Sequence, residues 1–294
     1  MKIKQSNNLS YCFGIQNAIE KTVQCVNNVA GNKKIYMLGE LAHNEEVIES
    51  IKELGVQIVY NVEEVAEDSV LIIRAHGAVK CTSDHVREKG IEIMDLTCPC
   101  IKAIQRKVIE MEKKGYAIVI IGDENHPEIE SIASFVKNPY IIATPNDCIK
   151  LENVNKRTYI VTQTTIVLEE ILPVIQKITL MVKRFVFENT ICLSTETRQK
   201  EIVELAQSYD MVLLIGSMRS NNTRNLYRIS KKINDMSFLV QDSEHLPIEI
   251  EQVNSIAVAS GASTPYSLIQ RIIEKISKQE SANELSGWGL NRKY

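Results

Sequence analysis

Residues 96–103 read LTCPCIKA, and this stretch joins an apolar run to an amphipathic one. Cys98 stands at the junction, and Pro99 fits the first turn of the helix that the pattern CIKAIQRKVIEMEKKG predicts. A thiolate is favoured at a helix N-terminus. Residues two apart on a helix point to different faces, so Cys98 and Cys100 are not expected to reach the same metal. We therefore expect Cys98 to be the chemically active cysteine and Cys100 to be a packed neighbour.

Short apolar runs alternate with amphipathic stretches along nearly the whole chain. The runs are IYMLGE, VLIIRAHG, AIVIIGDE, TYIVTQTT, MVLLIGS and SIAVASGAS, each ending in glycine or polar residues. Continuous apolar runs of this length are typical of strands that are buried on both faces of a parallel sheet. Stretches such as NEEVIESIKELG predict helices that end at a glycine. The sequence thus predicts an α/β fold throughout.

Composition limits the class of protein. The chain has 294 residues, 44% hydrophobic and 24% charged, with a net charge of −3. This favours two or three globular units and gives no general attraction to nucleic acid or to an anionic membrane. No signal-peptide core or membrane-length apolar run is present, so a cytoplasmic location is expected. The seven cysteines then predict reduced thiols, and the lack of any C-x-x-C argues against a zinc ribbon.

A long repeat becomes visible from three cysteines, Cys12, Cys98 and Cys192, which are 86 and 94 residues apart. Each precedes a predicted helix and then a strand that ends in glycine 27, 24 and 24 residues on. Polar residues follow each glycine, and a second polar cluster ends a later strand. The clusters are His43-Asn44 with residues 74–77, His126 to Glu128 with residues 162–165, and residues 220–222 with residues 260–263. The chain therefore resembles three diverged copies of one unit, whose strand ends could line one cavity.

Three thiolates from distant positions fit an iron–sulfur cluster better than a structural zinc ion, which needs four closed ligands. With three thiolates, one iron keeps an open position for substrate. On cysteine count alone, small buried cysteines are the more common alternative. The histidines favour a site, because His43, His76 and His126 all fall in strand-end loops and suit an anion pocket.

The segment NHPEIES adds a carboxylate. Pro127 suits the first turn of a helix, so His126 would lie beside an N-terminus that favours an anion. Glu128 would be an ordinary surface glutamate if exposed, and a proton donor if enclosed in a pocket. The segment RSNNTRN likewise predicts a helix start rich in hydrogen-bond donors.

Taken together, these motifs resemble the LytB/IspH reductases, which act on 4-hydroxy-3-methylbut-2-enyl diphosphate. The resemblance extends from about Cys12 to Pro265 and the helix beyond. It is carried by the pieces CFGI, AHN, AHG, TCP, HPEIE, QTT, ICLSTETRQ, GSMRSNNT and SGAS, in the order that the family has them.

The resemblance implies three similar α/β units in a pseudo-threefold trefoil around a central [4Fe–4S] cluster. The implied units are residues 13–97, 98–191 and 192–279, with residues 1–12 joining the third and residues 280–294 forming a C-terminal tail. The implied cluster ligands are Cys12, Cys98 and Cys192, which leave one iron open.

The resemblance also implies the roles of further residues. The implied catalytic residues are Glu128 as proton-relay acid and Thr164 or Thr165 near the substrate hydroxyl. The implied diphosphate-binding residues are His43, His76, His126, Ser220, Asn221, Asn222 and Ser263.

The implied reaction removes an allylic hydroxyl as water and yields isopentenyl and dimethylallyl diphosphate. The open iron acts as a Lewis acid and passes two electrons to the substrate. The sequence has no flavin or dinucleotide motif, so the electrons are expected from a partner such as ferredoxin or flavodoxin. No nucleic acid or membrane partner is expected.

Several positions depart from the family pattern. Gln16 and Asn17 stand where charge is common, Asn221 replaces a serine, and Ser131 replaces a glycine. Two alternatives therefore stay open: a cluster-bearing reductase or dehydratase of another phosphorylated substrate, and an iron–sulfur sensor without turnover. Glu128 and the QTT threonines favour catalysis, because a sensor needs no proton donor.

Overall fold

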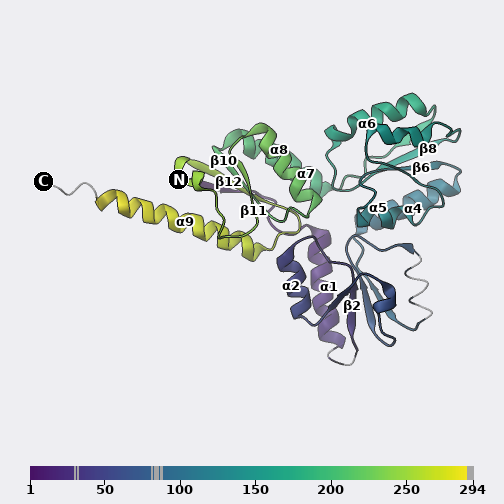
Figure 1. Ribbon diagram of the computed structural model, residues 1–294, viewed down its shortest axis with the longest axis horizontal. Coiled ribbons are helices and arrows are strands. Elements are labelled where there is room, and N and C mark those ends of the chain that lie inside the picture. The colour runs from purple at the N-terminus through teal and green to yellow at the C-terminus, as the bar shows by residue number, and fades with distance from the viewer. Residues whose placement is uncertain (30, 32, 81, 83–85, 87–88, 290–294) are drawn as a thin grey trace. The chain divides into compact units, whose positions relative to one another are not determined.

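The fold consists of three four-stranded parallel sheets with helices on their faces (Figure 1). A computed structural model describes residues 1–29, 31, 33–80, 82, 86 and 89–289, and the side chains only as far as residue 278. All six apolar runs form strands, and nearly all of their residues are buried. The predicted α/β class is therefore confirmed. Within the described residues, no helix combines the length and the apolar character that crossing a membrane requires.

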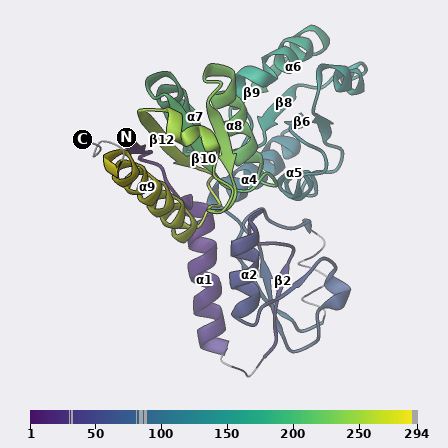
Figure 2. The same ribbon diagram turned by 60° about the vertical axis from the view of Figure 1, so that its left-hand side comes forward.

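The first sheet has the order β3-β2-β4-β5, with all neighbours parallel. In both views α1 and α2 lie beside the sheet that contains β2 (Figures 1 and 2). Its strands are β2 (Ile35–Leu38), β3 (Gln57–Val59), β4 (Val70–Ile73) and β5 (Glu92–Asp95), and its helices are α1 (Phe13–Val29), α2 (Glu45–Glu53) and the short 3-10 helix η1 (Val62–Glu64).

The second sheet repeats this order as β7-β6-β8-β9. Apolar side chains of α4 and α5 pack on one face, and those of α6 and η2 pack on the other. Its strands are β6 (Ala117–Ile121), β7 (Tyr140–Ile142), β8 (Thr158–Thr162) and β9 (Phe185–Phe187), and its helices are α4 (Pro99–Lys113), α5 (Pro127–Ala133), η2 (Pro145–Leu151) and α6 (Leu168–Met181).

The third sheet has the equivalent order, read from its other edge, β11-β10-β12-β1. Here α7 and α8 pack on one face and α9 on the other. Its strands are β1 (Lys2–Gln5), β10 (Met211–Ile215), β11 (Ser237–Val240) and β12 (Ser255–Ser260), and its helices are α7 (Leu193–Ser208), α8 (Asn221–Ile233), η3 (Ile248–Gln252) and α9 (Tyr266–Gly289).

The edge strands β5, β9 and β1 complete the repeat, because each leads into one of the three cysteines. β1 comes from the start of the chain and pairs in parallel with β12. Contacts group the first two sheets, residues 13–42 and 48–195, into one compact unit, and residues 1–12, 43–47 and 196–294 into another. The limits 13–97, 98–191 and 192–279 and the trefoil arrangement stay predictions. Residues 280–289, expected as a tail, continue α9.

Candidate active site

Each of the three predicted cluster cysteines is fixed by the same backbone hydrogen bond. Its N–H donates to a carbonyl in the loop that follows the neighbouring strand, β12, β4 or β8. The pairs are Cys12 with Ala262 at 2.9 Å, Cys98 with Ala75 at 2.9 Å, and Cys192 with Thr164 at 3.1 Å. Each cysteine is also placed directly before a long helix, α1, α4 or α7. The local geometry therefore repeats three times, with Cys98 and Cys192 in one compact unit and Cys12 in the other.

The thiols divide into three classes by exposure. Cys12, Cys98 and Cys192 are half-buried, Cys25 and Cys148 are buried in helix and sheet packing, and Cys100 is exposed. Burial is the main cause that raises the pKa of the Cys25 and Cys148 thiols, which makes them poor metal ligands. The remaining cysteine of the seven, at position 81, lies outside the described residues. Partial exposure at strand–helix junctions is what a ligand thiol requires, and the cysteines of the repeat have it.

Cys98 and Cys100, the two cysteines of the segment LTCPCIKA, differ in position and in exposure. Cys98 is the N-cap of α4 and Pro99 occupies its first turn, as predicted. A helix N-terminus is a position at which proteins commonly place thiolate ligands. Cys100 lies in the first helical turn, but it is exposed, so the expectation that it is packed was wrong. The α4 side chains that do pack are Ile101, Ile104, Gln105, Val108 and Met111.

Glu128 is enclosed, with 1% of its surface exposed. Its two carboxyl oxygens accept hydrogen bonds from the backbone N–H and the hydroxyl of Thr164, both at 2.7 Å. Burial raises the pKa of Glu128 to about 7, although the Thr164 hydrogen bonds act in the opposite direction. A carboxyl group of this kind exchanges its proton near neutral pH. The Thr164 carbonyl also accepts the Cys192 N–H, so one residue, Thr164, connects this acid by hydrogen bonds to a predicted cluster ligand.

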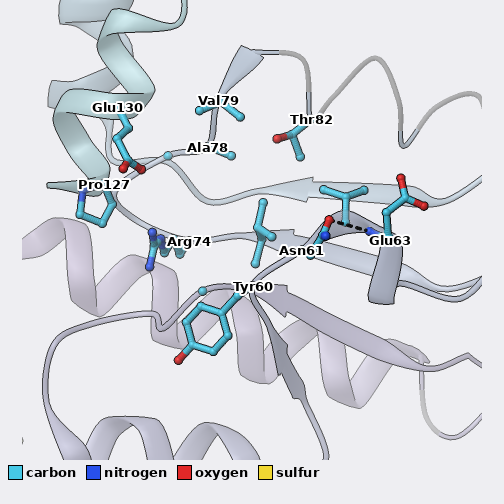
Figure 3. Close-up of a pocket in the computed structure, with 13 residues that line it drawn as sticks. Tyr60, Asn61, Glu63, Arg74, Ala78, Val79, Thr82, Pro127 and Glu130 are labelled. Carbon is cyan, nitrogen blue, oxygen red and sulfur yellow. Dashed lines mark hydrogen bonds between the residues drawn. The ribbon is translucent and has the colours of Figure 1, made fainter. Parts of the chain in front are cut away.

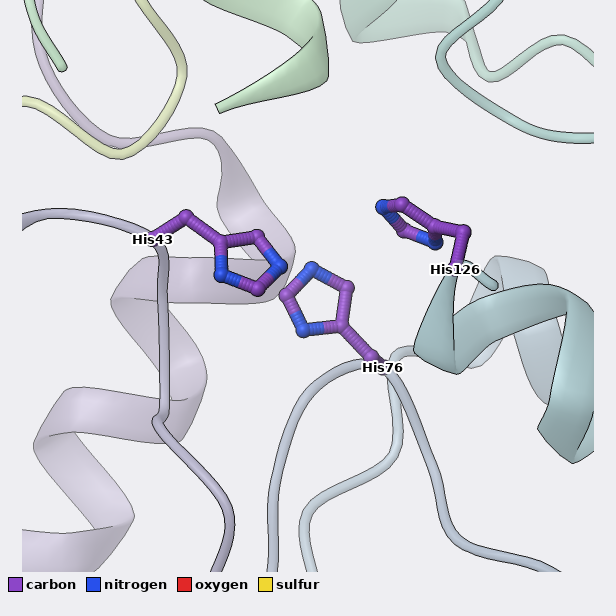
Figure 4. A group of neighbouring side chains, drawn as sticks. All are labelled: His43, His76 and His126. Carbon is purple, nitrogen blue, oxygen red and sulfur yellow. The ribbon is translucent and has the colours of Figure 1, made fainter. Parts of the chain in front are cut away.

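His126 and His76 come from adjacent strand-end loops and meet face to edge (Figure 4). Their ring centroids are 5.5 Å apart and their planes are inclined by 87°. His126 is the N-cap of α5, and its Nδ1 accepts the Glu128 N–H at 3.2 Å. In the neutral ring the proton is then on Nε2. His43 stands just before α2, at the corresponding point after β2.

A serine connects the helix that carries Glu128 to the loop that carries His76. The Ser131 hydroxyl donates to the carbonyl of Ala78 at 2.9 Å and accepts from the Gln105 amide at 2.9 Å. Gly77 has a φ of 81°, and a Cβ there would lie 2.5 Å from the Ser131 hydroxyl. Ser131 therefore fills the space where the loop passes α5. This hydrogen-bonded link was not visible in the sequence, where Ser131 was noted only as a departure from glycine.

We expect Ser131→Ala to lower the thermal midpoint of unfolding, because Gln105 would lose its buried acceptor. A lost buried hydrogen bond of this kind costs about 1–3 kcal/mol. In the double variant Ser131→Ala with Gln105→Met, the loss should be smaller than the sum of the two single losses, since both ends of one bond are removed. Differential scanning calorimetry of the four proteins measures this. An unchanged midpoint for Ser131→Ala would show that the link contributes nothing.

In the third sheet, buried donors and acceptors gather without partners. Asn222 and Ser263 are 4% and 6% exposed. The amide oxygen and nitrogen of Asn222 and the hydroxyl of Ser263 have no hydrogen-bond partner within the part of the chain that the structure describes. Ser220, the N-cap of α8, accepts from the Thr223 N–H at 3.4 Å. Unpaired buried polar atoms are costly, so this cluster is arranged for a polar ligand.

Asn221 and Thr165 each form a hydrogen bond with a nearby side chain, and this contact does not by itself favour a role in the site. Asn221 is half-buried in the first turn of α8, and its amide oxygen accepts a hydrogen bond from the Arg224 guanidinium. The Thr165 hydroxyl accepts from the Gln163 amide at 3.3 Å. Thr164, one of the two threonines left open by the sequence, contacts Glu128 through two hydrogen bonds.

Arg198 lies in the segment ICLSTETRQ, but its structural role was not predicted from the sequence. Arg198 is buried, and its guanidinium donates to the backbone carbonyls of Asn8, Ser10 and Ser260. These contacts hold the segment before Cys12 against the end of β12. A buried arginine that binds backbone carbonyls has no sequence signal, and the residues next to Arg198, Thr197 and Gln199, are polar like those of a surface helix.

A cavity of about 460 Å³ also lies at the carboxyl end of the first sheet (Figure 3). Arg74 lies among its lining residues, together with Tyr60, Asn61 and Glu130. Burial is the main cause that lowers the pKa of Arg74, and the nearby Glu130 and Glu40 act in the opposite direction. None of the predicted site residues lines this cavity, so it is distinct from the candidate site.

Comparison with known proteins gives one consistent result. The model of the family described as LytB protein matches residues 3–277. The 4-hydroxy-3-methylbut-2-enyl diphosphate reductase of Thermoanaerobacter sp. (strain X514) is 36% identical over 280 residues, which cover 94% of this chain and 96% of the relative. The reductase of the same name from Neorickettsia sennetsu is 34% identical over 278 residues, covering 94% and 91%.

Two solved structures are similar over most of their length. One is described as the structure of (E)-4-hydroxy-3-methyl-but-2-enyl diphosphate reductase, the terminal enzyme of the non-mevalonate pathway. It has a TM-score of 0.73 and 31% identity, and covers 95% of this chain and 100% of its own. The other is the E-1-hydroxy-2-methyl-but-2-enyl-4-diphosphate reductase from Plasmodium falciparum, with a TM-score of 0.85, 26% identity, and coverage of 93% and 87%.

Proposed function

Because this chain belongs to the LytB protein family, we propose that it reduces 4-hydroxy-3-methylbut-2-enyl diphosphate to isopentenyl and dimethylallyl diphosphate. The reaction breaks the bond between C4 and its hydroxyl oxygen. Two electrons and two protons are consumed, one proton leaving with the hydroxyl as water and the other reaching the allylic carbon. The residues of the chain must therefore bind a diphosphate, deliver protons and hold a redox group.

Family membership implies an iron–sulfur cofactor, and we propose Cys12, Cys98 and Cys192 as its ligands. Their shared position and backbone hydrogen bond, their partial exposure and the N-cap position of Cys98 fit thiolate ligands. The buried Cys25 and Cys148 and the exposed, non-equivalent Cys100 do not have these features. When bound, a [4Fe–4S] cluster supplies electrons and a Lewis-acidic iron for the departing hydroxyl.

We propose that buried donors of the strand-end loops bind the diphosphate. The unpaired side chains of Asn222 and Ser263 support this role, because phosphate oxygens would satisfy their hydrogen bonds. The α8 N-terminus adds free backbone N–H groups and a favourable dipole. The other proposed diphosphate-binding residues are His43, His76, His126, Ser220 and Asn221.

Glu128 carries the catalytic part of the proposal. A carboxyl group with a pKa of about 7 is protonated in about half of the molecules at neutral pH and can release that proton, as a general acid must. Thr164 fixes the carboxyl group through two hydrogen bonds of 2.7 Å. We therefore assign proton delivery to Glu128 and positioning of its carboxyl group to Thr164. This enclosed acid is the observation that most favours an enzyme over a sensor.

The proposal is tested by anaerobic turnover of the cluster-loaded protein. Reduced methyl viologen should lose its colour when the hydroxylated C5 diphosphate is added, because the substrate takes up two electrons. Viologen oxidation only with another phosphorylated compound would indicate a divergent reductase. A loaded cluster that oxidises no viologen with any of these compounds would indicate a sensor.

Asn222→Ala is expected to raise KM for the diphosphate substrate about tenfold or more, since a hydrogen bond to a charged group contributes about 1.5–3 kcal/mol. The thermal midpoint should not fall, because the removed amide has no partner in the described protein. Asn234 is the matched control at the other end of α8. Its amide donates to the Tyr209 carbonyl at 2.9 Å, so Asn234→Ala should lower the midpoint and leave KM unchanged. The opposite pattern would make Asn222 structural.

A further inference from the structure

The outward face of α8 has a concentration of positive charge that the proposed substrate site does not use. Arg224, Arg228, Lys231 and Lys232 recur at a spacing that places them on one helix face, and all four are exposed. The opposite face is buried through Asn222, Thr223, Leu226 and Ser230. We call these four cations the α8 basic face.

This charge pattern is unusual in the chain. The α8 segment NNTRNLYRISKKI contains four cations and no carboxylate, in a protein with a net charge of −3. Each of the other α-helices that the structure describes contains at least one Asp or Glu. Three members of the face contact neutral oxygens. The Arg228 guanidinium donates to the Asn225 amide oxygen at 2.8 Å. The Arg224 guanidinium donates to the Met218 carbonyl and to the Asn221 amide oxygen, and the Lys231 ammonium donates to the Asp235 carbonyl.

The shape and the residue types of the α8 basic face are also typical of a protein contact surface. A hollow of about 490 Å³ is lined by the four cations together with Met218, Asn225 and Tyr227. Met218, one of these lining residues, exposes 44% of its surface. Arginine, tyrosine and methionine are enriched in protein interfaces. A helix of 13 residues is about 20 Å long, which suits the small contact area of transient electron-transfer complexes, below about 1,200 Å² in total.

We propose that the α8 basic face docks an acidic electron-carrier protein. The inference rests on the proposed function, because each turnover needs two electrons and the sequence contains no flavin or dinucleotide motif. An acidic carrier complements the charge of the face, and complementary charge mainly speeds association. Nucleic acid and anionic membranes are disfavoured because the rest of the chain repels polyanions.

The test compares two electron sources on two charge-reversal variants. Lys231→Glu/Lys232→Glu alters the face, and Lys183→Glu/Arg184→Glu is the matched control at an exposed pair of cations outside α8. Turnover is measured at low salt with photochemically reduced acidic flavodoxin and with reduced methyl viologen. Reduced viologen is itself a cation, so loss of positive charge cannot slow its approach.

For the α8 variant, KM for flavodoxin is expected to rise about tenfold while the viologen rate stays within about twofold of the parent. The control variant should resemble the parent with both donors. Added salt should raise the KM of the parent for flavodoxin. The difference in this KM between the parent and the α8 variant should therefore become smaller. An unchanged KM for flavodoxin in the α8 variant, or an equal rise in the control, would overturn the proposal.

Direct binding separates this inference from the proposed function. Titration calorimetry with oxidised flavodoxin should show binding to the parent and about tenfold weaker binding to the α8 variant, whether or not the substrate turns over. Failure of viologen turnover would reject the proposed function by itself. Retention of the parent, but not of the α8 variant, on duplex DNA or phosphatidylserine vesicles, with equal flavodoxin binding, would overturn docking in favour of a polyanion.

Discussion

Glu128→Gln is expected to lower turnover at least about a hundredfold, while iron and sulfide content and substrate affinity stay those of the parent. Glutamine keeps the size of the side chain, and its amide oxygen can still accept one of the two Thr164 hydrogen bonds, but its amide nitrogen cannot accept the other and has no acidic proton to deliver. General acids contribute about 10²–10⁴-fold. Steady-state kinetics of the reconstituted variant measure the loss. If the variant instead fails to hold its cluster, Glu128 has a structural role.

The pH dependence follows from the same carboxyl group. Its pKa of about 7 lies above the ordinary value of 4.5, so the folded state binds its proton more tightly than the unfolded state does. The stability of the fold should therefore fall as pH rises from about 4.5 to about 7, by at most roughly 3 kcal/mol, and this contribution should be absent in Glu128→Gln. In the parent, kcat/KM should fall above about pH 7, where the acid is ionised. If another group delivers the proton, kcat/KM of Glu128→Gln should still fall above about pH 7, as it does in the parent.

Cys98→Ser is expected to lose the cluster and more than about 99% of the activity, because a three-ligand site has no spare thiolate. Cys192→Ser should behave alike, since its backbone position is equivalent. Cys100→Ser is the matched control two residues away, on an exposed side chain, and it should keep the iron content and the rate of the parent. Iron analysis and visible absorption after anaerobic purification give the result. Loss of iron from Cys100→Ser, and not from Cys98→Ser, would reverse the assignment.

The sheets were predictable because their strands are buried on both faces. Runs such as AIVII and MVLLI have no polar side, so they fit neither an amphipathic surface helix nor a half-exposed strand. A strand that is buried on both faces is the structure that fits them. Cys98 at the start of α4 was predictable for a similar reason, since proline is favoured in a first helical turn and disfavoured in the interior.

The contacts that position the site were not predictable from local pattern. The Ser131 hydroxyl joins Gln105 and Ala78, which are 26 and 53 residues away, and Arg198 binds carbonyls up to 190 residues away. Such contacts join segments that are distant in the sequence, so they produce no periodic pattern of residues from which they could be predicted. The exposure of Cys100 was misjudged because cysteine is usually buried. The extension of α9 to Gly289 lacks an apolar stripe, although residues such as Ala, Glu and Leu favour helix.

The most direct test of the central claim is the product balance of anaerobic turnover. The cluster-loaded protein, supplied with reduced viologen and 4-hydroxy-3-methylbut-2-enyl diphosphate, should consume two electrons for each substrate. Mass spectrometry should find isopentenyl and dimethylallyl diphosphate, each with one oxygen fewer than the substrate. Recovery of unchanged substrate from protein with a full complement of reduced cluster would contradict the proposed reaction.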